Sequence, residues 1–68
     1  MRKGALRIAR QALQTQGLKP LRWGALVCGG SATGAGPWWA LRVRVEDREG
    51  GRRTVYVRCL PGGRLVVD

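Results

Sequence analysis

Apolar and polar residues alternate through most of the C-terminal half of the chain, from Trp38 to Val67. Successive side chains of a β-strand point to opposite faces of the sheet, so this period of two predicts half-buried strands. Two stretches interrupt the alternation with the composition of turns: the charged, Gly-containing segment 46–53 and the Pro-Gly-Gly segment 61–63. The predicted buried face carries Trp39, Leu41, Val43, Val45, Val55, Val57, Cys59, Leu65 and Val67.

The register of the two predicted hairpins follows from pairing apolar residues with apolar residues on one face. In the second hairpin, this requirement predicts Cys59 opposite Leu65 and Val57 opposite Val67. In the first hairpin, it predicts these pairs: Val45 with Val55, Val43 with Val57 and Leu41 with Cys59 on the buried face, and Arg44 with Tyr56 and Arg42 with Arg58 on the other. Like charges directly opposite destabilise a sheet, so an Arg42–Arg58 pair would point to a role other than stability.

The N-terminal part follows a helical period instead. Segment 4–16 predicts an amphipathic helix with an apolar face made of Ala5, Leu6, Ile8, Ala9, Ala12 and Leu13. Gly17, followed by Leu18 and Pro20, is typical of a helix end. Segment 21–28 then predicts a first strand, in which Gly24 either weakens the strand or marks a bulge. One face of this strand is predicted to carry Leu21, Trp23, Ala25 and Val27.

Together these elements predict an α+β fold, in which one N-terminal helix packs on a small antiparallel sheet of about four strands in an α-β-β-β-β meander. The 68 residues form one small basic domain, covering 1–68. A core of this size is close to the lower limit for independent stability, so homodimerisation is a further expectation.

The charge of the chain is strongly one-sided, with 13 Lys and Arg residues against 4 Asp and Glu and a net charge of +9. Such a balance favours a polyanionic partner, with DNA or RNA first and an acidic protein surface or anionic membrane next. A basic bias without a dedicated polyanion site stays open. We expect no membrane span and no secretory signal, and therefore a cytoplasmic location with Cys28 and Cys59 as reduced thiols.

The composition argues against an enzyme or a metal site. The chain contains no His, and its two Cys residues are far apart in the sequence. Segment 29–37, GGSATGAGP, has the glycine spacing of a phosphate-binding loop but lacks the Lys and the Ser or Thr that should follow Gly34. We interpret it as a flexible loop between strands. We expect no catalytic residue, no metal and no cofactor.

The best candidate site is the second face of the predicted sheet, where aromatic rings could stack on bases and cations could contact phosphates. Its predicted residues are Trp38, Arg42, Arg44, Tyr56, Arg58 and Arg64, with Arg7 and Arg10 contributed by the polar stripe of the helix. This face predicts a non-enzymatic nucleic-acid-binding module. Two alternatives stay open: an ordinary solvated sheet face, and a small phage- or mobile-element-type inhibitor or adaptor, anti-CRISPR-like, that docks on a nucleic-acid-handling protein complex.

Overall fold

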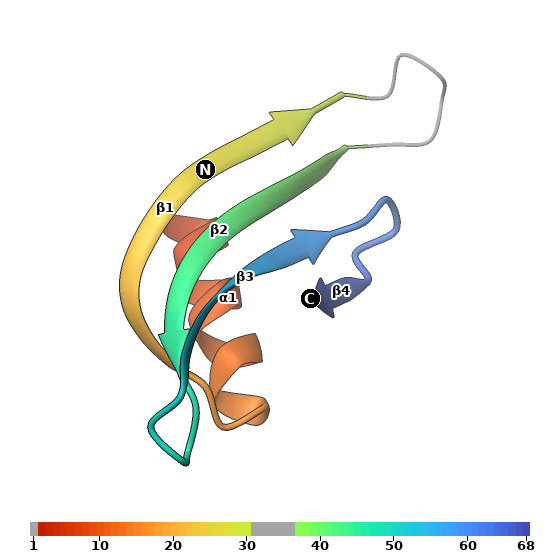
Figure 1. The fold of residues 1–68 in the computed structure, drawn as a ribbon. Coiled ribbons are helices and arrows are strands. Elements are labelled where there is room, and N and C mark those ends of the chain that lie inside the picture. Colours follow the sequence, from red (N-terminus) through yellow and green to blue (C-terminus); the bar gives the residue numbers. More distant parts are fainter. Residues whose placement is uncertain (1, 31–36) are drawn as a thin grey trace.

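The computed structural model describes residues 2–30 and 37–68 and confirms the predicted fold class. The elements are α1 (Arg2–Thr15), β1 (Lys19–Gly29), β2 (Trp38–Glu46), β3 (Arg52–Cys59) and β4 (Leu65–Val67). The strands form one antiparallel sheet in the order β1-β2-β3-β4. Figure 1 shows the long strands β1 and β2 bowed around α1, so the helix covers one face of the sheet. Residues 31–36 of the predicted loop lie outside the described residues.

The hydrophobic core lies between α1 and the sheet. Ala9 and Leu13 of the helix are fully buried, and they pack with five buried residues of β2 and β3: Leu41, Val43, Val45, Val55 and Val57. The predicted apolar face of the helix is wrong at Ile8, which is 41% exposed. The buried row runs through Ala5, Ala9 and Leu13, four residues apart, and Ile8 lies on the flank of that row.

The helix ends at the predicted stop signal. The backbone N–H of Leu18 donates to the carbonyl of Leu13 at 2.9 Å, and that of Gly17 donates to the carbonyl of Gln14 at 3.0 Å. Gly17 has a φ of 72°, and Leu18 is buried in the same cluster as Leu13. These are the features of a Schellman motif, which satisfies the last helix carbonyls and turns the chain into β1.

The predicted faces of β2 and β3 are correct, but the predicted register between them is wrong by two residues. The observed pairs are Trp39 with Cys59, Leu41 with Val57, Val43 with Val55, Arg42 with Tyr56, Arg44 with Thr54 and Ala40 with Arg58. A shift of two residues leaves each side chain on its own face, so the core pattern survives. The predicted opposition of Arg42 and Arg58 does not occur. The pairs predicted between β3 and β4 are confirmed.

The turn between β2 and β3 sets this register. The N–H of Asp47 donates to the carbonyl of Gly51 at 2.8 Å, which closes a three-residue loop. The Asp47 carboxylate also accepts hydrogen bonds from the N–H groups of Glu49 and Gly51, at 2.9 and 2.8 Å. Gly50 takes the positive φ, 87°, that a loop of this kind requires.

The predicted face of β1 is wrong, because two register shifts interrupt this strand. They lie between Pro20 and Arg22 and between Trp23 and Leu26. Each shift inserts an extra residue, and the side chains beyond it change faces. Trp23 packs on the helix-covered face opposite Val43, whereas Leu21 and Val27, predicted to share its face, are 41% and 54% exposed. Gly24 lies in the second shift, so the bulge interpretation is the correct one.

Candidate functional site

The sheet face opposite α1, here called the open face, carries the sheet residues of the predicted site. Trp38 and Tyr56 are 37% and 40% exposed on it, and their strands place four arginines on the same face. From the strand pairing, the residues of the open face are Lys19, Arg22, Val27, Gly29, Trp38, Ala40, Arg42, Arg44, Glu46, Arg52, Thr54, Tyr56, Arg58 and Val66. Arg64 lies in the turn before β4, is exposed, and lies outside both hollows of this face described below.

A hollow of about 410 Å³ on the open face, here called the arginine hollow, is lined by Arg22, Trp23, Gly24, Arg42, Arg44 and Thr54. Its described lining has three guanidinium groups and no carboxylate. Arg22 lies directly opposite Arg44 in the sheet register. The only side-chain hydrogen bond of these arginines within the described residues joins Arg44 Nη1 to Thr54 Oγ1 at 3.3 Å. Three guanidinium groups without a carboxylate make this hollow a site of concentrated positive charge. Like charges directly opposite each other, such as Arg22 and Arg44, also repel.

Gly24 allows this hollow to form. A β-carbon at Gly24 would lie 2.9 Å from both the carbonyl oxygen and Nε of Arg42. Without that β-carbon, the side chain of Arg42 can lie close to the backbone of β1. The bulge at Gly24 thus brings an arginine of β2 toward Arg22 of β1.

A second hollow of the open face has an aromatic wall. It measures about 240 Å³, is here called the tryptophan hollow, and is lined by Trp38, Trp39, Ala40, Arg58, Cys59, Leu60 and Pro61. The indole of Trp38 occupies the space in which a β-carbon of its sheet partner Gly29 would stand. Trp38 therefore rests on the backbone of β1, and its remaining exposed surface is available to a flat ligand.

Arg58 is occupied by contacts within the protein, unlike the arginines of the arginine hollow. Its Nε lies 3.0 Å from Asp68 Oδ1, and its guanidinium carbon lies 5.2 Å from the centroid of the Tyr56 ring. The carboxylate balances the charge of Arg58, and the stacking holds the aromatic ring in place. Arg58 is thus better suited to orienting Tyr56 than to holding an anion.

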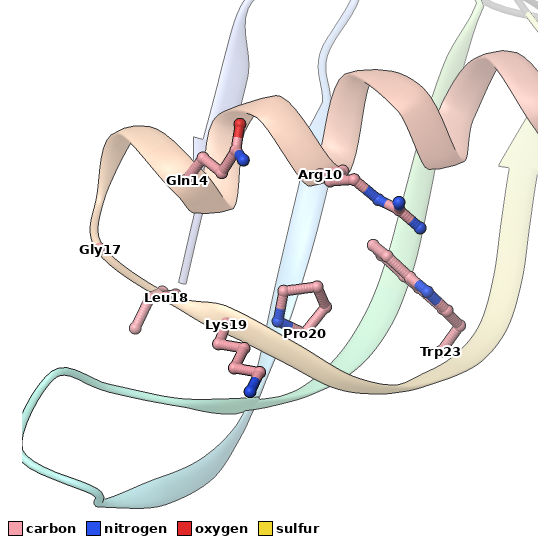
Figure 2. Close-up of a pocket in the computed structure, with 7 residues that line it drawn as sticks. All are labelled: Arg10, Gln14, Gly17, Leu18, Lys19, Pro20 and Trp23. Atoms are coloured by element: carbon pink, nitrogen blue, oxygen red, sulfur yellow. The ribbon is translucent and has the colours of Figure 1, made fainter.

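The predicted helix residues Arg7 and Arg10 lie on the other side of the sheet, with α1. A hollow of about 510 Å³ between α1 and β1, here called the helix-edge hollow, is lined by Arg10, Gln14, Gly17, Leu18, Lys19, Pro20 and Trp23 (Figure 2). The guanidinium carbon of Arg10 lies 5.7 Å from the centroid of a Trp23 ring. Arg7 lines a different hollow of about 300 Å³ with Lys3, Leu6 and Arg10.

Sequence reasoning missed Arg22, Trp23 and Lys19 as site residues. Unbroken alternation along β1 assigns Trp23 to the core alone and gives no reason to group Arg22 with Arg42. The available signal was Gly24, which marked a bulge without showing which side chains it would redirect.

The two cysteines are unbonded, Cys28 exposed and Cys59 half-buried. Both pair with Trp39 in the sheet, from opposite sides. They are thus two strand spacings apart, about 9.5 Å. A disulfide needs Cα atoms about 4.4–6.8 Å apart, so these residues cannot form one within the folded sheet.

Within residues 2–30 and 37–68, no helix has the length and apolar character needed to cross a membrane. Comparison with known protein families, curated proteins and solved structures finds no match to this chain.

Proposed function

We propose that this protein is a non-enzymatic module that binds single-stranded nucleic acid on its open face. The observation that carries the proposal is the arginine hollow, in which Arg22, Arg42 and Arg44 converge without a carboxylate among the described lining residues. It shares one uncovered sheet face with the exposed rings of Trp38 and Tyr56.

The charge arrangement supports an anionic ligand. Repulsion between Arg22 and Arg44 lowers the stability of the free protein, and a bound phosphate would relieve it. Two acidic residues lie on this side. Asp68 forms an ion pair with Arg58, and Glu46 lies between two cationic residues, Lys19 and Arg52, its partners on the neighbouring strands. The field over the arginine hollow is therefore positive.

The aromatic residues support a single strand over a duplex. Unstacked bases present their flat faces to aromatic side chains, and each stacked base contributes about 1–3 kcal/mol. The bases of a duplex are already stacked on one another. Trp38 and Tyr56 therefore add affinity mainly for single strands. We also propose that the protein acts in the cytoplasm, where an exposed thiol such as that of Cys28 stays reduced.

An inhibitor or adaptor that docks on a nucleic-acid-handling protein is the second candidate. The observation that favours it is the exposure of Leu21 and Val27 on the edge strand β1, 41% and 54%. Apolar side chains of this kind are more typical of a protein contact than of a phosphate contact.

Fluorescence anisotropy with labelled single strands and duplexes of about 12 nucleotides, at several salt concentrations, tests the proposal. The informative variant is Arg42→Gln combined with Arg44→Gln. The matched control is Arg48→Gln combined with Arg53→Gln, which removes the same charge from a hollow that also contains Asp47 and Glu49.

We expect the first variant to reduce the slope of log affinity against log salt by about 1.4, or about 0.7 for each lost phosphate contact. The control should leave the slope unchanged. Absence of binding to any oligonucleotide, or equal losses in both variants, would reject the arginine hollow as the site. Tight capture by a nucleic-acid-handling protein without oligonucleotide binding would favour the second candidate.

A further inference from the structure

The arginine hollow and the helix-edge hollow meet at one point of the molecule. Trp23 lines both of them. Arg22 and Trp23 are adjacent in β1 and pair with adjacent residues of β2, Arg44 and Val43, so their side chains leave the strand on opposite faces. In the described sheet β1 is an edge strand, and the two hollows are separated only by the thickness of β1.

The helix-edge hollow has the chemistry of a nucleotide site. Arg10 stacks near the indole of Trp23, and Figure 2 shows its guanidinium reaching from α1 toward that ring. Gln14 adds an amide, and no carboxylate is present among the described residues that line the hollow. Lys19 lines its rim, but this residue pairs with Glu46 and its side chain leaves β1 on the open face. A planar guanidinium on an aromatic ring can stack with a base while its N–H groups contact a phosphate.

The edge of β1 is poorly suited to pairing with another β-strand. Pro20 has no backbone N–H, and the two register shifts disturb the regular spacing of hydrogen-bonding groups along the strand. A protein partner that extends the sheet at this part of the edge is therefore disfavoured. A polynucleotide needs no such ladder, because its contacts are made to side chains.

We propose that a bound single strand crosses the edge of the sheet at Arg22 and Trp23, so that it occupies the arginine hollow and the helix-edge hollow together. Arg10 contacts its phosphates on the helix side, and Trp23 and Arg10 offer the stacking surface there. This path rests on the proposed function and extends it to a second set of residues. It also excludes an intact duplex as the ligand of both hollows, because duplex DNA has a persistence length of about 50 nm and cannot turn around one β-strand.

A length series of single strands tests the path, with oligonucleotides of about 4, 8 and 12 nucleotides measured by anisotropy at several salt concentrations. The variant is Arg10→Gln, at an exposed position of α1. The control is Arg48→Gln, which removes the same charge from the hollow that also contains Asp47 and Glu49. Circular dichroism melts check that each variant is folded.

We expect the shortest strand to bind the variant and the wild type equally, because it fits within the open face. The longest strand should lose about 0.7 units of salt slope in the variant, through one lost phosphate contact. The control should bind strands of every length as the wild type does.

An unchanged affinity of the Arg10→Gln variant for the longest strand would overturn the path. The proposed function would survive that result if Arg42→Gln with Arg44→Gln still weakened binding. A loss of equal size for the shortest and longest strands would also overturn the path, because the helix-edge hollow would then be the primary site. Failure of the wild type to bind any oligonucleotide would reject both the path and the proposed function.

Discussion

The adjacent tryptophans of β2 should respond in opposite ways to truncation. Trp39 packs against the core cluster, and removal of such a side chain costs about 3–5 kcal/mol when it is fully buried. Since Trp39 is partly exposed, we expect the lower end, about 3 kcal/mol, for Trp39→Ala. A domain of this size loses about 4–8 °C of Tm for each kcal/mol, so its Tm should fall by about 12–24 °C.

Trp38→Ala should affect binding more than stability. Trp38 is 37% exposed and rests on Gly29, and a cross-strand contact of this kind contributes about 0.2–1 kcal/mol. Its Tm should therefore fall by less than about 8 °C. If a base stacks on the indole, the affinity for a single strand should fall by about 1–3 kcal/mol, roughly 5- to 150-fold.

Melts followed by far-UV circular dichroism, together with anisotropy titrations, measure both effects. Trp38→Phe is the control, because it keeps an aromatic face and should retain most of the affinity. If Trp38→Ala unfolds the protein as Trp39→Ala does, the assignment of the two faces is false. If Trp38→Ala is folded and binds with full affinity, Trp38 is not a stacking surface and the arginine hollow acts by charge alone.

Two further predictions concern the fold. Gly17→Ala places a β-carbon at a φ of 72° and against the Arg48 guanidinium, so we expect it to lower the free energy of unfolding by about 1–2 kcal/mol in urea titrations. An unchanged urea midpoint would mean that α1 does not end in the left-handed conformation. Cys28 should react with a thiol reagent faster than the half-buried Cys59, and oxidation of the folded protein should give no internal disulfide; an intramolecular Cys28–Cys59 bond detected by mass spectrometry in native protein would contradict the sheet register.

The faces of β2 and β3 were predictable because their alternation is unbroken and a side chain's face depends only on the parity of its position. The register between these strands was not predictable from the alternation, because it depends on the conformation of the turn. Gly50 and Gly51 are adjacent, and both could supply a positive φ. In the structure Gly50 has the positive φ, and the Asp47 carboxylate holds the loop by accepting hydrogen bonds from two backbone N–H groups. That choice depends on hydrogen-bond geometry, which the apolar pattern does not contain.

The candidate site was predictable only in part for a related reason. Trp38, Arg42, Arg44 and Tyr56 follow from the same parity argument as the core. The contact between Arg58 and Asp68 does not follow from parity, because it forms only when β4 brings Asp68 beside Tyr56. This contact changes the interpretation of Arg58 from an available cation to one already paired.

The two bulges of β1 connect the fold to the proposed site. Leu26 faces the helix-covered side, opposite Leu41. From Leu26, regular alternation would direct Arg22 to that same side, against α1, and Trp23 to the open face. The bulge at Gly24 reverses both: Trp23 contributes to the core, and Arg22 joins Arg42 and Arg44. The bulge gives up regular sheet hydrogen bonds and creates a like-charged pair, and neither effect stabilises the free protein. Burial of Trp23 offsets part of this cost, but it does not require an arginine at position 22. An anion bound in the arginine hollow would account for that arginine.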